Sequence, residues 1–361
     1  MIRRSWRRFR LRIDELRLKP ILDYKKASTL DAAGDDFRFF GGFESVTDGR
    51  ILWVRSGALT IPVDLEAAQI YLLPLENTQG AIFDLDSVEC ERIRWNKLTA
   101  LHEGTGVFIG GRALSKNGKA IFKSSKDEPL LVILFDGHER AILSRTVRAG
   151  RHRNEYWNPI TPFSLAFGVF SELFIALSFS ARPAFRISSV AAFVAALGPL
   201  IPLLPPGLLI TTVYQRLWKR ARAYRAFRDL VRLPLCHLTN GLTETILENG
   251  EKYVRISGTK SVIKENEVQI PVLPSGTNLK GEYDWVYFGI GDENVLDNGV
   301  LLPREPKDPM AVFAAIPGDP ETLSKYYSRN ARLLEIASGL LLISAITINA
   351  LGAFFIINTL R

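Results

Sequence analysis

Three long apolar stretches constrain the fold of this 361-residue chain more than any other feature. They cover residues 160–181, 187–213 and 333–360, and they carry one, no and one charged side chain, namely Glu172 in the first and Glu335 in the third. A helix needs roughly 20 apolar residues, at about 1.5 Å each, to cross about 30 Å of hydrocarbon. The sequence therefore predicts three transmembrane helices. A helix buried in a protein core is the alternative for the first stretch, because Glu172 and two nearby prolines weaken it.

The second stretch contains residues that interrupt helices. Proline removes an amide donor and clashes with the preceding turn, so this span is either kinked or broken into a re-entrant loop. The kinked span is the favoured reading. The residues concerned are Gly198, Pro199, Pro202, Pro205, Pro206 and Gly207.

Positive charge is concentrated in two short segments. The whole chain has 46 Lys and Arg against 38 Asp and Glu, for a net charge of +8. Residues 1–26 carry ten cationic side chains against three carboxylates, and residues 216–232 carry seven against one, so the rest of the chain is acidic overall. Such patches face anionic lipid or phosphate more often than they serve a fold. Lys and Arg near the ends of the predicted spans place the regions 37–150 and 240–320 in the cytoplasm and the turn between the first two spans on the external side, as expected for a bacterial inner membrane protein.

Both basic segments have the pattern of amphipathic helices. In residues 1–26, an apolar residue recurs every three or four positions from Ile2 to Leu16, and arginine dominates the other faces. We predict a basic helix in the headgroup region, although a helix docked on the protein or a transit peptide would share the pattern. Residues 214–233 are predicted to continue the second span along the same surface. The predicted headgroup-binding residues are Arg3, Arg4, Arg7, Arg8, Arg10, Arg12, Arg216, Lys219, Arg220 and Arg222.

Two regions, 37–150 and 240–320, have short apolar runs punctuated by turn residues. Asn117-Gly118 and Asp48-Gly49 supply the positive φ angles that tight hairpins need. We therefore predict two small antiparallel β modules, barrel-like or sandwich-like. Leu114–Gly118 and Val295–Gly299 share a hairpin pattern, each followed by a lysine at the same spacing, which indicates an internal repeat unless the shared turn chemistry is coincidental.

A family resemblance rests on these modules. Glu103–Gly111, the hairpin and Asp127–Val132 resemble the membrane-proximal β domain of the GIDE-type mitochondrial ubiquitin ligases. Leu323–Arg332, which leads into the last apolar stretch, resembles the end of that domain. Those ligases begin with a membrane helix and carry a cysteine-rich RING, whereas this sequence begins with an arginine-rich segment and has two cysteines. The resemblance therefore implies a noncatalytic β domain and no ligase activity.

The sequence offers few groups for chemistry. The four histidines lack metal-site spacing, the glycines lack dinucleotide-binding spacing, and no phosphate-binding or nucleophile motif is present, so we predict no cofactor, no metal and no enzyme activity. Glu172 is the exception, because an intramembrane carboxylate marks a proton or ion relay, a polar contact between helices or a protonated hydrogen-bonded group. Asn349 is its candidate partner.

The resulting fold class is an α+β membrane protein with two β modules, three transmembrane helices and basic amphipathic helices. Its predicted function is noncatalytic, that of a membrane-bound interaction or scaffold component. The predicted partners are anionic lipid and either another protein or further copies of the chain, whereas nucleic acid is disfavoured because the β regions are not basic. The alternative is a subunit of a small transporter or channel that uses Glu172.

Overall fold

The computed structural model describes residues 2–47, 50–73, 90–95, 101–102, 104–125, 128–152, 187, 207–238, 242–258, 270–274, 284–291, 296–297, 300–301 and 303–359. The chain divides into two compact units, each discontinuous in sequence. The β unit comprises Arg4–Arg153 and Ala226–Tyr326, and the helical unit comprises Met1–Arg3, Asn154–Arg225 and Tyr327–Arg361.

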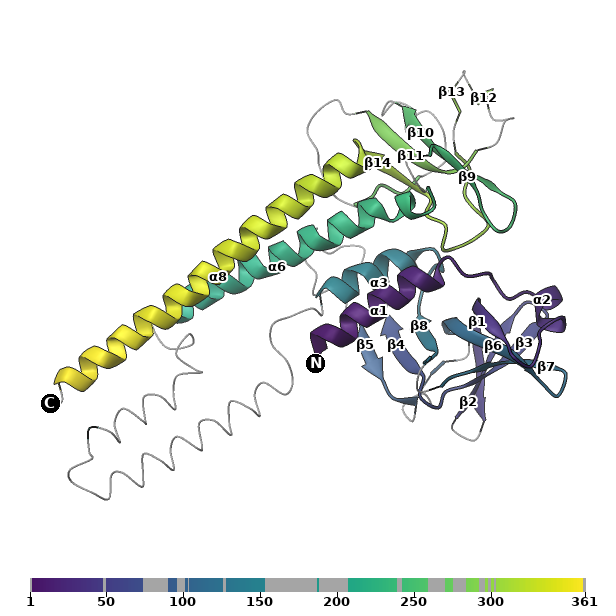
Figure 1. The fold of residues 1–361 in the computed structure, drawn as a ribbon, viewed down its shortest axis with the longest axis horizontal. Helices are drawn as coiled ribbons and strands as arrows, with labels where there is room; N and C mark the ends of the chain where they lie inside the picture. The colour runs from purple at the N-terminus through teal and green to yellow at the C-terminus, as the bar shows by residue number, and fades with distance from the viewer. Residues whose placement is uncertain are drawn as a thin grey trace. The chain divides into compact units, whose positions relative to one another are not determined.

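The larger sheet of the β unit has the strand order β1-β2-β3-β7-β6-β8-β4-β5 (Figure 1). An additional pairing between β1 and β6 closes the first five strands into a barrel-like ring. The pairings β3–β7 and β4–β8 are parallel, so the expectation of a purely antiparallel module is wrong in those two places. The strands are β1 (Asp35–Thr47), β2 (Ile51–Ser56), β3 (Leu59–Asp64), β4 (Gln69–Leu73), β5 (Glu91–Ile93), β6 (Gly106–Lys116), β7 (Lys119–Lys123) and β8 (Leu131–Phe135).

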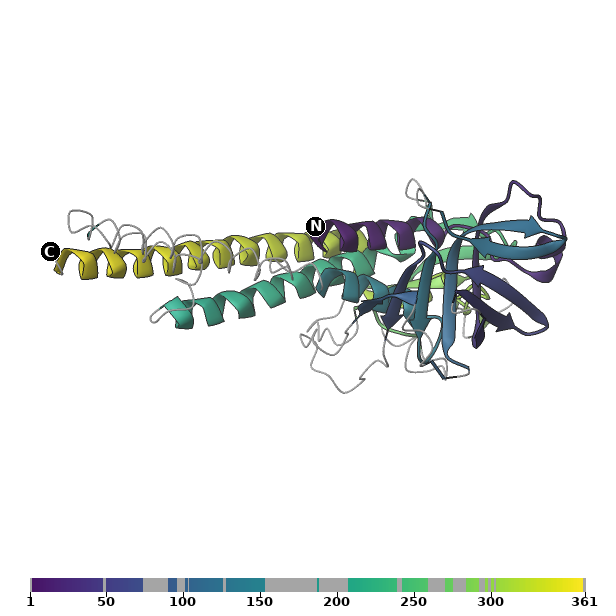
Figure 2. The ribbon, with the colours of Figure 1, turned by 90° about the horizontal axis from the view of Figure 1, so that it is seen from below.

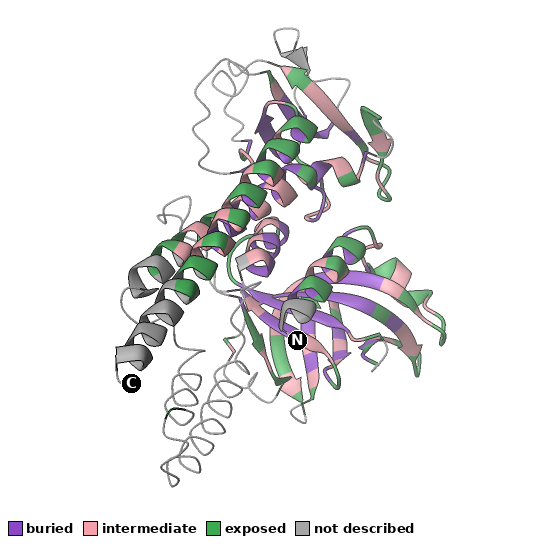
Figure 3. Ribbon diagram, turned by 60° about the vertical axis from the view of Figure 1, so that its left-hand side comes forward, coloured by how far each residue is buried: buried purple, intermediate pink, exposed green. Residues whose placement is uncertain are grey.

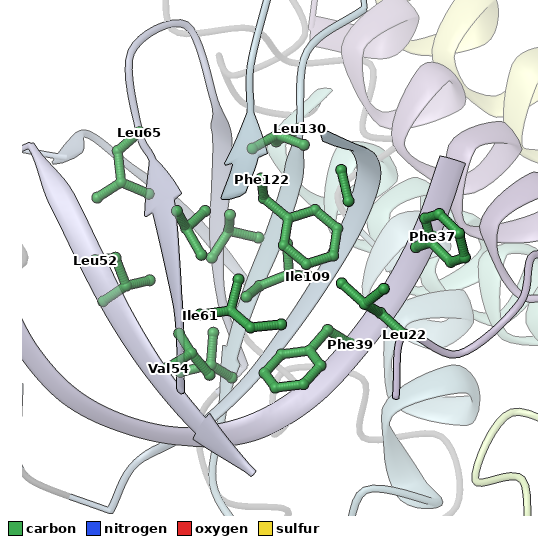
Figure 4. Close-up of a cluster of buried hydrophobic side chains, with 14 of the residues drawn as sticks. Leu22, Phe37, Phe39, Leu52, Val54, Ile61, Leu65, Ile109, Phe122 and Leu130 are labelled. Atoms are coloured by element: carbon green, nitrogen blue, oxygen red, sulfur yellow. The ribbon is translucent and has the colours of Figure 1, made fainter. Parts of the chain in front are cut away.

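The core of the closed ring consists of alternate side chains from its strands, which point inward as the pleat requires (Figure 4). Phe39, Ile61 and Phe122 are at most 2% exposed. The hairpin between β6 and β7 turns at Asn117 and Gly118, with φ angles of 53° and 72°. This positive-φ turn confirms the hairpin that the Asn-Gly pair predicts.

A smaller sheet has the order β14-β11-β10-β9, and β12 and β13 form a separate hairpin. Its central strand β11 pairs antiparallel with β10 and β14, as β6 pairs with β1 and β8 in the larger sheet. Val272 bridges in parallel to Ala315 of β14, as β4 does to β8. The two sheets therefore share these strand pairings, and the internal repeat in the sequence stays a prediction. The strands are β9 (Glu244–Ile246), β10 (Lys252–Gly258), β11 (Trp285–Ile290), β12 (Leu296–Asp297), β13 (Val300–Leu301) and β14 (Ala314–Pro317).

Helices precede and follow both sheets (Figures 1 and 2). The α6 helix includes Gly207–Val213, which the sequence assigned to the second span, as well as most of the predicted basic segment 214–233. The helices are α1 (Ile2–Leu16), α2 (Tyr24–Ser28), α3 (Ala141–His152), α6 (Gly207–Arg232) and α8 (Pro320–Thr359), with a 3₁₀ turn η5 (Pro234–Cys236).

The apolar stripe of α1 is buried against the larger sheet. Phe9 is fully buried, and its ring centroid lies 4.2 Å from that of Tyr71 on β4. Leu16 lies over Gly110 of β6, where a Cβ atom would come within 2.5 Å of Leu16 Cδ1. The sequence left three interpretations open for this helix. The packing in the β unit agrees with the one in which α1 docks on the protein.

Among the residues that the structure describes, none of the helices combines the length and the apolar character needed to cross a bilayer. The predicted fold class with three transmembrane helices is therefore wrong, and so is the integral location in a bacterial inner membrane with cytoplasmic modules. Residues 160–181 and most of 187–213 lie outside the described residues. Of the predicted span 333–360, residues 333–359 lie within α8, where Glu335 and Ser338 interrupt the apolar side chains. A carboxylate is costly in hydrocarbon, and Glu335 makes ion pairs with two arginines of α6. These pairs argue against placing this turn of α8 inside a bilayer.

A buried ion pair links the two sheets within the β unit. Arg38 on β1 donates two hydrogen bonds to Asp308, which precedes β14, and the Nη1–Oδ1 distance is 2.8 Å. These side chains are only 5% and 13% exposed. Asp308 Oδ1 also accepts a 2.9 Å hydrogen bond from the amide of Met310. Nearby, Arg17 donates to the carbonyl oxygen of Leu233 at 3.3 Å.

We expect Phe9→Ala to lower the free energy of unfolding by about 3 kcal/mol or more, because it leaves a cavity between α1 and the sheet. Urea denaturation followed by circular dichroism measures this change. The matched control is Leu11→Ala on the same helix, where the side chain is 58% exposed and the expected loss is small. Equal losses for the two variants would contradict the docking of α1.

We expect Asp308→Ala to cost about 3 kcal/mol of unfolding free energy, because it leaves the buried Arg38 guanidinium without its carboxylate. The control is Glu305→Ala in the same loop. Glu305 pairs with Arg140, but the two side chains are 52% and 36% exposed, so the expected cost is about 1 kcal/mol or less. If both variants unfold at the same urea concentration, Arg38–Asp308 does not link the sheets.

Candidate interaction surface

The predicted headgroup-binding residues differ in their exposure. Five of the side chains are exposed, and three others are less exposed and make ion pairs with carboxylates of the same chain. Nothing is described of the side chains of Arg3 and Arg4, which lie in the first turn of α1. The exposed residues are Arg7, Arg8, Arg216, Lys219 and Arg220, and the paired ones are Arg10, Arg12 and Arg222.

Arg10 belongs to a cluster in which three arginines from three helices share the carboxylate of Asp229. Arg151 of α3 donates Nε to Asp229 Oδ2 at 2.5 Å, Arg228 of α6 donates Nε to Oδ1 at 2.8 Å, and Arg10 of α1 lies 3.4 Å from Oδ2. Burial lowers the pKa of Arg151 to about 10, against the opposing effect of Asp229, and it also lowers the pKa of Arg10. Burial raises the pKa of the neighbouring Asp14. The cluster joins α1, α3 and α6, so Arg10 has a structural partner within the protein.

The helices α1 and α3 approach closely beside this cluster. A Cβ atom on Gly150 would come within 2.6 Å of Arg10 Cγ, so glycine permits the contact. On α3, the buried Arg145 donates to the carbonyl oxygens of Asp136 and Leu73 at 2.6 and 2.9 Å. Asp136 directly follows β8, and Leu73 is the last residue of β4. Arg145 therefore links α3 to the carboxyl ends of these two strands, which are parallel neighbours in the sheet.

In the helical unit, α6 and α8 lie side by side and run in opposite directions (Figures 1 and 2). Glu335 of α8 accepts hydrogen bonds from Arg222 and Arg225 of α6, at 3.1 Å and 2.9 Å. The Arg222 guanidinium also lies 4.1 Å from the centroid of the Trp218 ring, a cation–π geometry. Trp218 in turn stacks on Tyr214 at a centroid distance of 6.1 Å. The carboxylate and the two guanidiniums therefore set the register between the two helices.

Many residues of α8 are exposed (Figure 3), and four of them form an apolar stripe. Leu333, Ile336, Leu340 and Ile343 are 55%, 62%, 61% and 62% exposed. Their spacing of three, four and three residues places them along one face of the helix. Contiguous apolar residues in contact with solvent mark binding surfaces, whereas single exposed ones are ordinary.

The exposed cations of α6 lie at the same level of the helix pair as this stripe. Because the helices are antiparallel and Glu335 meets Arg222 and Arg225, Arg216 and Arg220 lie opposite roughly residues 338–343, at about 1.5 Å per residue. We use the name helical face for the exposed apolar stripe of α8 together with the exposed Lys and Arg side chains that the structure describes in this unit. Its members are Leu333, Ile336, Leu340, Ile343, Arg216, Lys219, Arg220, Arg329 and Arg332.

Sequence reasoning missed the exposed stripe of this face, because it assigned 333–360 to the interior of a bilayer. It also counted Glu335 only as the single charged residue of a predicted span and assigned it no partner. The signal in the sequence was the set of arginines on α6 together with Glu335 on α8, but only the pairing of the two helices shows that these residues meet.

The two predicted intramembrane polar residues remain untested. Glu172 lies outside the described residues, and Asn349 lies in α8 at a position where the side chain is not described. Within the described ranges, no group of three His, Cys, Asp or Glu side chains could hold a metal ion.

Known protein families, curated proteins and solved structures were compared with this chain, and none of them matches. The resemblance to the β domain of GIDE-type ligases therefore stays a prediction.

We expect Glu335→Gln to destabilise the helical unit by roughly 2 kcal/mol, because Arg222 and Arg225 are 6% and 16% exposed and would lose their shared carboxylate. Hydrogen exchange of the backbone amides in α6 and α8 measures the change as faster exchange. Glu321→Gln, an exposed carboxylate in the first turn of α8, is the control and should leave these amides protected. Unchanged exchange in Glu335→Gln would show that this pair does not hold the helices together.

Proposed function

We propose that this chain is a noncatalytic interaction protein that acts as a scaffold and binds its partner through the helical face. One observation carries the proposal: four large aliphatic side chains are more than half exposed along a single stripe of α8.

The energetic argument is that this stripe is unfavourable in water. Full burial of a Leu or Ile side chain is worth about 1.5–3 kcal/mol, so covering the four exposed halves would contribute several kcal/mol to binding. That is enough to favour a partner, even though part of it is lost to the entropy of association.

The β unit supports the scaffold role by its rigidity. The Arg38–Asp308 pair joins its two sheets, and the Asp229 cluster joins the helices α1, α3 and α6. Such internally paired charges stabilise a fixed arrangement of elements, which is what a scaffold requires.

The test is sedimentation of the tagged full chain from gently lysed cells on a density gradient. We expect the wild type to sediment in a particle much larger than 40.4 kDa, and Ile336→Ser with Leu340→Ser to sediment at the mass of the chain alone. The control is Leu11→Ser with Leu18→Ser, which removes one leucine of α1 and one just after it that are 58% and 51% exposed but lie outside the helical face. A wild type that sediments as the single chain, or a control as impaired as the test variant, would contradict the proposal.

A further inference from the structure

The helical unit carries a strong excess of positive charge. Residues 207–225 and 327–359 contain seven Lys and Arg side chains and one carboxylate, Glu335. That carboxylate is held by Arg222 and Arg225 in the interior of the pair. The remaining cations, Arg216, Lys219, Arg220, Arg329 and Arg332, are all exposed. Among the side chains that the structure describes in this unit, the exposed charges around the apolar stripe are therefore all positive.

We infer that the occupant of the helical face is an anionic lipid surface, with the arginines on the headgroup phosphates and the Leu and Ile side chains among the headgroups and upper acyl chains. This inference rests on the proposed function and names its partner. An interfacial helix combines cations on one face with large apolar side chains on another and lies along the surface. Each Lys or Arg near such a surface strengthens binding by electrostatic attraction.

Tyr214 of α6 fits the same ligand, whereas the indole nitrogen of Trp218 is buried in the protein. Tyr214 and Trp218 are half-buried, stack on each other and lie within the turns that carry Arg216 and Arg220. Tyr and Trp prefer the headgroup layer, where one part of the ring is apolar and the other part is wet.

Charge complementarity also distinguishes this occupant from the others. Two copies of the chain would bring two strongly cationic faces together, and like charges across an interface disfavour association. A nucleic acid would satisfy the cations, but it offers no apolar surface for Leu340 and Ile343. An anionic lipid surface satisfies both kinds of side chain.

The experiment is flotation of the full chain with large unilamellar vesicles of phosphatidylcholine, with and without phosphatidylglycerol, at low and high salt. We expect strong binding only to the anionic vesicles, weakened at high salt because screening shortens the reach of the charges. The triple variant Arg216→Ser, Arg220→Ser, Arg332→Ser should bind roughly 100-fold more weakly, since each cation contributes about a factor of five.

The matched control is Lys116→Ser, Lys119→Ser, Lys123→Ser, which removes three exposed cations from the β6–β7 hairpin of the β unit. It should keep wild-type binding. Equal binding to neutral and anionic vesicles, equal loss in the control, or no binding of the wild type would overturn the inference. A soluble dimer that Leu340→Ser dissociates, or a preference for an oligonucleotide over the vesicles, would overturn it in favour of another occupant.

The two proposals fail separately. In one outcome, Ile336→Ser with Leu340→Ser releases the chain from its large particle, but the wild type does not bind anionic vesicles. The helical face then still binds a partner, and only the lipid surface is excluded as that partner. If the wild type sediments as the single chain and also fails to float, both proposals fall.

Discussion

The pair between Arg38 and Asp308 is the constraint on which the β unit depends. It joins residues 270 positions apart, and both side chains are nearly buried. A buried guanidinium is tolerable only with a carboxylate and further hydrogen-bond acceptors. Asp308 supplies the carboxylate, and the carbonyl oxygen of Lys19 accepts a hydrogen bond from Arg38 Nε. Asp308 in turn accepts a hydrogen bond from the amide of Met310. The pair connects β1 of the larger sheet to the segment before β14 of the smaller sheet. The two sheets therefore belong to one compact unit.

Carboxylates also pair with poorly exposed arginines in the helices. Asp229 gathers arginines from α1, α3 and α6, and Glu335 gathers two from α6. The net charge of the two basic segments therefore overstates the charge available to a ligand. What remains exposed on the helical unit is a smaller set of cations beside an apolar stripe, and this combination is what narrows the class of partner.

Local patterns predicted local structure well. The periodic stripe from Trp6 to Leu16 forms a helix, and Asn117-Gly118 forms a tight hairpin, because both depend on neighbouring residues only. The parallel pairs β3–β7 and β4–β8 and the pair Arg38–Asp308 join distant residues, which composition and periodicity do not encode. The ion pairs of Glu335 are of the same kind, because Arg222 and Arg225 lie on another helix. The sequence pattern did not show these pairs, and residues 333–360 were therefore assigned to a bilayer. Of the candidate site, the exposed cations of α6 were predictable and the α8 stripe was not.

The separation between Arg38 and Asp308 has a consequence for biosynthesis. A ribosome adds about 5–20 residues per second, so Arg38 emerges roughly 15–50 s before the aspartate that will neutralise it. During that interval the first sheet can close its ring, but it must hold a guanidinium at a site that later excludes water. A nascent chain in this state would be the form most open to proteases and chaperones, and the arrival of Asp308 would end that exposure.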